Sequence, residues 1–312
     1  MAEPRAPDAQ LTAKASPSYV ANNLTSNAAC SRVAYAHRCS LCVLEEPEGR
    51  GAWRQVALRD DSPVYHLRFV VVAPGMEVLV ATTERSVQVW NDEATMMLLS
   101  HPLPAPAGDA SGYACGAAAA GGSLHVGAST GQLLVFRCFS GSLRYSRTVD
   151  AHSAPVGDLA GSEAVLVSGD GGGCLTWWSA EKLTRIGSVE GQGSACTSLA
   201  MGPSSLVAGF ASGHVRIFAP DAPSPLLEVV AHGRFVSAVS VHPAGRLFLS
   251  AGEDCYVNVW TLPAAAGEKL ALRHSLRAGK GVVVGAAFVG GGGGSVVAAM
   301  HDLLALPRFE GC

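Results

Sequence analysis

Three side chains in the C-terminal part of the sequence have the residue types of a nucleophilic triad. His232, Ser250 and Asp254 offer an imidazole, a hydroxyl and a carboxylate. In a hydrolase, the histidine would take the proton of the serine as it attacks a carbonyl, and the aspartate would orient the imidazole. His152 and Asp158 begin a second, partial set. Such a set can act only if its hydroxyl reaches a substrate, which depends on the elements that carry it.

Cys39 and Cys42 form a C-x-x-C pair, a spacing used in zinc binding and in redox chemistry. A tetrahedral zinc site needs further ligands, and the nearest other cysteine, Cys30, lies on a different predicted strand. Residues three apart on a strand also point to opposite faces of the sheet. We therefore expect buried thiols and no metal.

Two glycine-rich runs, residues 171–173 and 290–294, could be taken for phosphate-binding loops. Neither precedes a helix or a lysine at the spacing of such a loop. We expect turns at both places and no cofactor.

The composition favours many short strands joined by tight turns. Of the 312 residues, 15% are charged and 36 are glycine, and the formal net charge is −3. No run of Lys or Arg is long enough to follow a phosphate backbone or an anionic lipid surface. We therefore expect no nucleic acid partner.

Residues 281–300 form an uncharged stretch long enough for a transmembrane helix. Seven of them are glycine, which favours two buried strands joined by a turn over a membrane span. The N-terminal segment MAEPRAPDAQLTAKAS is polar and lacks the apolar core of a secretory signal. We therefore expect a cytoplasmic protein without membrane insertion, in which the nine cysteines are thiols.

A repeated unit is clearest in residues 231–262, where apolar and polar residues alternate in three runs separated by turn residues. Each run predicts a strand. The unit resembles a WD40 repeat, whose buried tetrad it matches with His232, Ser250, Asp254 and Trp260. Buried together, these polar groups can satisfy one another, whereas any one alone would be costly. The serine hydroxyl is then expected inside the sheet, which favours a structural role over catalysis.

The same frame occurs seven times along the chain. The third-strand anchors, 40 to 49 residues apart, are Leu44, Trp90, Phe136, Trp178, Phe218, Trp260 and Phe309. A four-stranded propeller blade has about 40–45 residues. The fourth copy keeps His152, Ser168 and Trp178 of the tetrad. It has Gly172 at the aspartate position, with Asp170 two residues earlier. We therefore predict an all-β, seven-bladed WD40-type β-propeller that spans residues 1–312 as a single domain.

Closing the ring requires an outer strand for the last blade, because few residues follow Phe309. The segment near residues 10–16 is expected to pair there, which protects an open strand edge and locks the ring. The offset within the sixth unit places the innermost strand of the first blade at residues 20–25. Residues 1–9 are expected to be flexible.

Five stretches resemble, in their order and spacing, the WD repeat-containing protein 54 family. They are ANNLTSNAA, LHVGASTGQLLVF, LVAGFASGHVRIF, LSAGEDCYVNVWTL and HDLLALPRF. The resemblance implies a cytoplasmic propeller with scaffold-like roles in signalling or assembly and with no established enzymatic reaction. The sequence departs from the general WD pattern after the third-strand tryptophan, where Asn91, Ser179 and Thr261 replace aspartate.

These observations predict a non-catalytic scaffold for protein–protein interaction. The partner-contact residues are expected in the loops of one face, namely those that join the second strand to the third and one blade to the next. The candidates are His37, Arg38, Arg85, His214, Arg234, Glu253 and His301. The sequence leaves open which protein or peptide binds there, and also whether the chain forms homo-oligomers.

Three other functions are weighed against this prediction. A substrate receptor of a cullin-type ubiquitin ligase usually carries W-D-x-R at the end of a blade, but here Trp260 is followed by Thr-Leu-Pro. A component of a ciliary or microtubule-associated assembly is compatible with the fold, although no residue requires it. A propeller enzyme would need clustered carboxylates or metal ligands along its channel, but the predicted innermost strands CGAAAA, VGDLAG, VSAVSV and VVVGAAF offer only one acidic side chain, Asp158.

Overall fold

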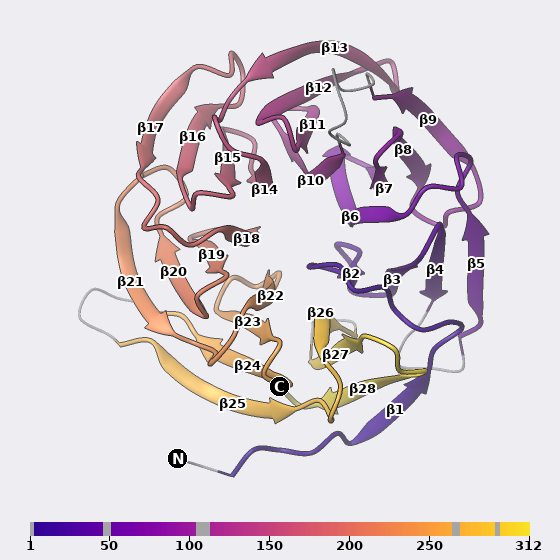
Figure 1. Cartoon of the computed structure of the whole chain (residues 1–312), viewed down its shortest axis with the longest axis vertical. Coiled ribbons are helices and arrows are strands. Elements are labelled where there is room, and N and C mark those ends of the chain that lie inside the picture. Colours follow the sequence, from indigo (N-terminus) through magenta and orange to yellow (C-terminus); the bar gives the residue numbers. More distant parts are fainter. Residues whose placement is uncertain (1–2, 46–50, 104–112, 264–268, 291–293) are drawn as a thin grey trace.

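The computed structural model shows seven four-stranded sheets arranged in a ring around a central axis (Figure 1). The structure describes residues 3–45, 51–103, 113–263, 269–290 and 294–312. Within these ranges every regular element is a strand, and the paired strands of each sheet are antiparallel. The predicted all-β propeller with seven blades is confirmed.

The sheets are numbered one to seven in chain order, and the first strand of each lies next to the axis (Figure 1). Sheets one to three contain β2 (Thr25–Ser26), β3 (Arg32–His37), β4 (Ser40–Glu45), β5 (Trp53–Ala57), β6 (Val64–Ala73), β7 (Met76–Thr83), β8 (Ser86–Asn91), β9 (Met97–Pro102), β10 (Ala114–Ala120), β11 (Ser123–Ala128), β12 (Gln132–Phe139) and β13 (Ser142–Asp150). Sheets four to six contain β14 (Val156–Gly161), β15 (Val165–Asp170), β16 (Leu175–Ser179), β17 (Arg185–Val189), β18 (Cys196–Met201), β19 (Leu206–Phe210), β20 (His214–Phe218), β21 (Pro225–Val230), β22 (Val236–Val241), β23 (Leu247–Gly252), β24 (Tyr256–Thr261) and β25 (Ala271–Arg277). Sheet seven contains β26 (Val283–Val289), β27 (Ser295–Met300), β28 (Ala305–Glu310) and, as its outer strand, β1 (Ala9–Thr12).

The seven anchor residues all lie on the third strand of their sheets. They are Leu44 on β4, Trp90 on β8, Phe136 on β12, Trp178 on β16, Phe218 on β20, Trp260 on β24 and Phe309 on β28. Spacing alone locates these strands because each sheet repeats the same four-strand meander.

The hydrophobic core is divided among the joints between neighbouring sheets. Side chains alternate along a strand, so each sheet can bury one face against the sheet before it and the other against the sheet after it. At the joint of sheets four and five, Trp177 of β16 packs against Phe218 of β20 with ring centroids 5.3 Å apart. Buried clusters occupy all seven joints. Each sheet therefore depends on both of its neighbours.

β1 closes the ring by pairing antiparallel with β28. Side chains of sheet one fix the segment further, since the Trp53 indole donates to Thr12 O at 2.7 Å. The Tyr35 hydroxyl donates to Ala15 O at 2.7 Å. The prediction that an N-terminal strand supplies the outer strand of the last blade is confirmed.

The expected flexibility of residues 1–9 does not agree with the part of this segment that the structure describes. Arg5 N donates to Ser275 O at 2.8 Å, and Arg277 N donates to Arg5 O at 2.9 Å. Asp8 accepts the backbone N–H of Glu310 at 2.8 Å. The segment is held because the outer strand β25 offers unpaired peptide groups along its edge.

The innermost strand of sheet one also differs from the prediction. Residues 20–25 are expected to form it, but only Thr25 and Ser26 pair with β3. Asn22 has a φ of 57°, a left-handed conformation that interrupts a strand. Residues 16–24, called the crossing segment below, instead run over one face of the ring toward its centre (Figure 1).

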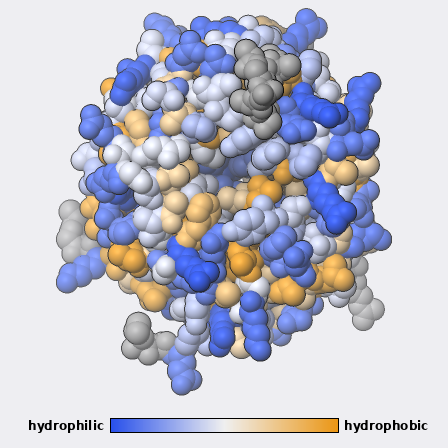
Figure 2. Space-filling model, viewed as in Figure 1, coloured by the Kyte–Doolittle hydropathy of each residue, from blue (hydrophilic) through white to orange (hydrophobic). Residues whose placement is uncertain are grey.

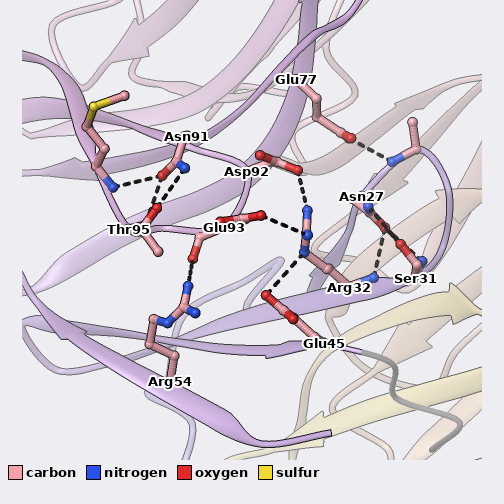
Figure 3. Close-up of polar contacts among 12 residues, drawn as sticks. Asn27, Ser31, Arg32, Glu45, Arg54, Glu77, Asn91, Asp92, Glu93 and Thr95 are labelled. Carbon is pink, nitrogen blue, oxygen red and sulfur yellow. Dashed lines mark hydrogen bonds and ion pairs between the residues drawn. The ribbon is translucent and has the colours of Figure 1, made fainter.

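Charged side chains strengthen the joint between sheets one and two on the opposite face (Figure 3). Arg32 of β3 forms ion pairs with three carboxylates, those of Glu45 at 3.7 Å, Glu93 at 3.5 Å and Asp92. Arg54 of β5 donates to the backbone carbonyl of Glu93. These contacts connect the first sheet to the β8–β9 turn of the second.

None of the described residues forms a helix long and apolar enough to cross a membrane. The uncharged residues 281–300 instead contain β26 and β27, which pair antiparallel as predicted. Of the glycine-rich run at 290–294, residues 291–293 lie outside the described part of the chain.

Candidate functional site

In sheet six, the four polar residues of the repeat form one hydrogen-bonded chain. The Trp260 indole donates to Ser250 Oγ at 3.0 Å, and Ser250 Oγ lies 2.9 Å from His232 Nε2. His232 Nδ1 lies 2.9 Å from Asp254 Oδ1. Because an ionised carboxylate only accepts, Nδ1 carries a proton, and in the neutral imidazole Nε2 then accepts the serine O–H. The chain connects β23 and β24 with the loop that enters the sheet.

Sheet four builds the same chain from a displaced aspartate. His152 Nδ1 lies 3.0 Å from Asp170 Oδ2, and its Nε2 lies 2.6 Å from Ser168 Oγ. Ser168 Oγ accepts the Trp178 indole N–H at 2.8 Å. Gly172 stands at the expected aspartate position, but Asp170 at the end of β15 reaches the imidazole instead. Asp170 Oδ1 also accepts the N–H of Gly172 at 2.9 Å, so the glycine-rich turn folds around this carboxylate.

Neither serine of these two chains is placed for nucleophilic attack. Ser168 and Ser250 are both 0% exposed, and each hydroxyl is already bonded to an indole and an imidazole. A reacting carbonyl would have to come within about 3 Å of the hydroxyl. Asp158, which was considered as a triad member with His152, pairs with Arg68 instead. Both chains therefore stabilise their sheets.

Sheet two carries a different set of polar contacts, which the sequence analysis missed. Asp60, in the loop before β6, accepts the Thr83 hydroxyl at 2.9 Å and the Ser86 hydroxyl at 2.5 Å. Ala81 occupies the register position of the tetrad serine. The buried indole N–H of Trp90 consequently has no hydrogen-bond partner among the described residues. The available signal was the offset of Asp60 from its inner strand, which equals that of the sheet-six histidine.

The cysteines are free thiols, Cys42 buried on β4 and Cys39 half-buried in the turn before it. Burial raises the pKa of the Cys42 thiol above its ordinary value. His152, Asp170 and Cys174 bring potential ligand atoms within 4.8 Å of one another. Both ring nitrogens of this histidine are held in the tetrad. A metal ion there would have to displace a structural hydrogen bond.

The centre of the ring contains a buried ion pair that the sequence analysis did not predict. Arg68 Nη2 on β6 lies 2.7 Å from Asp158 Oδ2 on β14. Arg68 Nη1 donates to Ala117 O on β10 at 3.2 Å. Asp158 accepts the backbone N–H groups of Leu159 at 2.8 Å and of Leu199 on β18 at 2.7 Å. The inner strands of sheets two, three, four and five are thus joined through one pair of charges.

Asn22 of the crossing segment extends this network from one face of the ring. Its Oδ1 accepts the Ser198 hydroxyl at 2.6 Å, and its Nδ2 donates to Thr197 O at 3.1 Å. Nδ2 also lies 3.4 Å from Asp158 Oδ2. The backbone N–H of Asn22 donates to Ser237 O on β22 at 2.7 Å. The crossing segment therefore covers the centre of the ring and connects sheets four, five and six.

Burial raises the pKa of the Asp158 carboxyl, although the Arg68 guanidinium and two backbone N–H groups act in the opposite direction. The carboxylate is 0% exposed. The carboxylate oxygens accept hydrogen bonds from protein donors. A substrate could displace these donors only by breaking the contacts at the centre of the ring.

On the opposite face, the centre of the ring is a cavity of about 360 Å³. Its walls are mostly small and aliphatic side chains of the inner strands, with the amide of Asn27 and the guanidinium of Arg68 among the polar groups. Among the described residues, no carboxylate or imidazole lines it. The lining that the structure describes includes the thiol of Cys30, but none of the carboxylate and imidazole groups that commonly act as acids, bases and metal ligands.

The seven residues proposed for partner contact lie in loops or at the strand ends beside them, on the face that the crossing segment covers. In a four-stranded antiparallel sheet, the turn between the second and third strands and the loop to the next sheet emerge on the same side. The positions are His37 and Arg38 at the β3–β4 turn, Arg85 between β7 and β8, His214 at the start of β20, Arg234 before β22, Glu253 between β23 and β24, and His301 between β27 and β28.

The crossing segment brings four of these seven residues together, from sheets one, six and seven. The contacts are Ser16 O with His37 Nδ1 at 2.6 Å, Ser18 Oγ with the N–H of Arg38 at 2.6 Å, Pro17 O with His301 Nδ1 at 3.2 Å, and the Tyr19 hydroxyl with the Glu253 carboxylate. Residues 20–25 were predicted to form a strand and residues 17–19 were assigned to no element, so this segment was not included in the predicted face.

Exposed apolar side chains lie beside the charged ones on this face. Tyr19 is 58% exposed and Leu304, in the β27–β28 turn, is 60% exposed. The Arg85 side chain is 69% exposed. Figure 2, which views the ring along its axis, shows hydrophilic residues over most of the edge and apolar residues in separate patches, several of them in the lower half of the view.

Sequence comparison finds relatives that cover most of the chain. The family model described as WDR54 matches residues 38–312. The chain is 29% identical over 255 residues to "WD repeat domain 54" of Rattus norvegicus, which covers 76% of each protein. It is 28% identical over 256 residues to "WD repeat-containing protein 54" of Homo sapiens, which covers 77% of this chain and 76% of the relative.

Solved structures share the fold at lower identity. A chain of "Crystal Structure of Mitotic Checkpoint Complex" superposes with a TM-score of 0.79 at 18% identity and covers 98% of this chain and 95% of that chain. "Structure of U3-55K" superposes with a TM-score of 0.73 at 16% identity, over 91% and 88% of the two chains. These two likenesses concern the fold alone. Because the family model spans residues 38–312, the chain belongs to the WDR54 family of WD-repeat β-propellers.

Proposed function

We propose that this chain is a non-catalytic platform that holds partner proteins against the face covered by the crossing segment. One observation carries the proposal: beside the exposed charged loops of this face, the crossing segment presents an aromatic side chain on a backbone that is hydrogen-bonded to several sheets at once. Tyr19 is 58% exposed, yet its neighbour Ser18 contacts sheet one and Asn22 contacts sheet six. A surface that is ordered before binding loses little conformational entropy when a partner docks.

The residue types of this face also favour protein recognition. Tyrosine and arginine are enriched among residues that dominate binding energy at protein interfaces. Tyr19, Arg38, Arg85 and Arg234 supply both types on the same side of the ring. The WD40 fold and the WDR54 relatives support a role in protein interaction in general terms.

The centre of the ring supports binding over chemistry. Its buried charges are paired with each other and with backbone groups, and the cavity behind them lacks acid–base residues among those described. We expect the platform to act in the cytoplasm, and imaging of a tagged chain in intact cells would check this location.

Charge reversal at two loops of the face tests the proposal. In the double variant Arg85→Glu with Arg234→Glu, we expect the set of proteins captured by cross-linking in cells to shrink, because the charge of the proposed binding face is reversed at two loops. Both side chains face solvent, so the substitutions should leave the fold intact. The matched control reverses Arg144 on β13 and Arg273 on β25, two exposed arginines of the outer strands. Capture profiles that are the same for the wild type and both double variants would contradict the proposal.

A further inference from the structure

A small pocket opens between sheets six and seven beneath the crossing segment. Its volume is about 190 Å³. Small-molecule sites in proteins have about 300–1,000 Å³, so this pocket is the size of one side chain. The crossing segment forms one wall with Val20 and Ala21, and residues 282–284 form the wall on the side of sheet seven.

The wall of the pocket includes a buried polar group without a hydrogen-bond partner among the described residues. Ser237 is only 3% exposed, and its hydroxyl makes no hydrogen bond to any described residue. A buried hydroxyl without a partner is costly, which favours a ligand atom or a water molecule beside it.

The equivalent residue of the preceding sheet makes a contact that Ser237 lacks. Thr197 lies at the bulge of β18, as Ser237 lies at the bulge of β22. The Thr197 hydroxyl donates to Val236 O of the next sheet at 2.6 Å, and its oxygen also lies 3.1 Å from Gly209 O of its own sheet. Serine at this place lacks the methyl group of threonine and bridges to neither. The joint between sheets six and seven therefore lacks the hydroxyl bridge that Thr197 makes between sheets five and six.

The rim of the pocket carries a single carboxylate. Glu253, in the β23–β24 turn, accepts the Tyr19 hydroxyl and has no cationic partner within 4 Å among the described residues. The tyrosine ring in turn packs edge-on against His301, with ring centroids 5.3 Å apart. None of the residues that line the pocket is basic. The Glu253 carboxylate would therefore repel an anionic ligand, whereas it could form an ion pair with a cationic one.

We propose that this pocket binds the side chain of a lysine presented by a partner protein. The four methylene groups of lysine match the apolar walls of Val20, Ala21 and residues 282–284, and its ammonium group can donate to the Glu253 carboxylate at the rim. An arginine fits less well, because its planar fork favours a bidentate carboxylate. One side of the Glu253 carboxylate is already occupied by Tyr19. This inference rests on the proposed interaction role of the same face.

The test uses the full chain and a minimal probe, Nα-acetyl-lysine N-methylamide, whose side-chain ammonium group is free. Methyl-labelled valine is the NMR reporter. We expect shifts confined to Val20 and to the valines at 282–284, with a dissociation constant in the millimolar range. N-acetyl-norleucine methylamide, which has the apolar stem without the charge, and the arginine analogue should each bind at least about tenfold more weakly. Equal binding of lysine and norleucine, shifts elsewhere, or no shift at saturation would overturn the proposal.

Two variants separate the contributions. Glu253→Gln should weaken the lysine probe at least about tenfold, whereas the control Glu163→Gln, at an exposed position of the opposite face, should leave it unchanged. Ser237→Thr should also weaken it, because the added methyl group fills the pocket in the way that Thr197 does in sheet five. A failure of the probe together with loss of partner capture in the Arg85 and Arg234 double variant would reject the pocket and keep the platform. Binding of the probe together with unchanged partner capture in the double variant would keep the pocket and reject the platform.

Discussion

Arg68 and Asp158 form an ion pair of 2.7 Å between the inner strands of the second and fourth sheets. The carboxylate is 0% exposed and the guanidinium side chain 19% exposed. Each charge is also bonded to backbone groups of neighbouring sheets, so the pair fixes the distances between inner strands that no covalent connection controls. The ion pair therefore has a structural role at the centre of the ring, which is where a propeller enzyme would hold its catalytic residues.

Substituting Asp158→Asn should lower the free energy of unfolding by about 3 kcal/mol. The amide keeps the size of the side chain but leaves the Arg68 guanidinium without a counter-charge in a largely buried place. Urea denaturation followed by tryptophan fluorescence would measure the loss. Adding Arg68→Met to this variant should recover part of it, because no unpaired charge remains. A single variant within 0.5 kcal/mol of the wild type, taken as roughly the size of a surface effect, would show that the pair is not structural.

Asn22→Gly should destabilise the ring by about 2 kcal/mol, because the amide side chain loses its contacts with Ser198 and Thr197. Asn22→Ala should cost about 1 kcal/mol more, since alanine opposes the φ of 57° that glycine adopts freely. The two unfolding curves measured side by side separate the network from the backbone. Equal stabilities would mean that the left-handed conformation at this position carries no strain.

Asp170→Ala and Asp254→Ala should each lower stability by about 2–4 kcal/mol, since each carboxylate holds the histidine of a buried tetrad. Burial alone would raise the pKa of Asp254, but its bonds to His232 and to backbone N–H groups bring it below the ordinary value. The control is Asp150→Ala, an exposed aspartate bonded to Gln132, with an expected change below about 0.5 kcal/mol. If Asp170→Ala matched this control in thermal unfolding, the displaced aspartate would not replace the usual one.

His125→Leu should make stability less sensitive to acid. Burial lowers the pKa of His125 from 6.5 to about 4 in the folded chain. Between these two pH values the unfolded chain binds a proton that the folded chain does not. The contribution of His125 to the free energy of unfolding is therefore fully present above about pH 6.5 and is lost as the pH falls toward 4. This difference corresponds to about 3 kcal/mol. Urea midpoints from pH 7.5 to 4 should therefore fall more steeply for the wild type than for the variant, and parallel profiles would refute the assignment.

The features that could be predicted from the sequence are those that repeat. Trp178 and Trp260 mark third strands because each sheet buries the same positions in the same register, so one complete unit locates the others. Ring closure followed from the missing strand of the last blade. The geometry of the tetrad in sheet six was equally accessible, because its four residues belong to one local pattern.

The features that the sequence did not reveal depend on single contacts between distant residues. Arg68 and Asp158 lie in different units, and no periodic pattern links a charge on one inner strand to a charge on another. Asn22 looked like part of a strand because its neighbours fit the offset of the sixth unit, yet its left-handed conformation turns the chain across the face. Asp170 lies two residues before the usual aspartate position of the tetrad, and the sequence therefore did not reveal its role. A carboxylate at the end of β15 can nevertheless reach the same imidazole as one in the turn.

Deleting residues 1–18 should lower the melting temperature by roughly 10 °C or more, or yield aggregates. The deletion removes β1 from the edge of β28, together with the contacts of Thr12 with Trp53 and of Ala15 with Tyr35. Several kcal/mol are lost with them, and each shifts the melting temperature of a large domain by about 2–4 °C. An edge left open in this way is also a site for association between chains. Deleting only residues 1–4 is the control, because it leaves Arg5 paired with β25 and should not change the melting temperature. A soluble chain without residues 1–18 that melts like the wild type would show that the ring closes without its N-terminal strand.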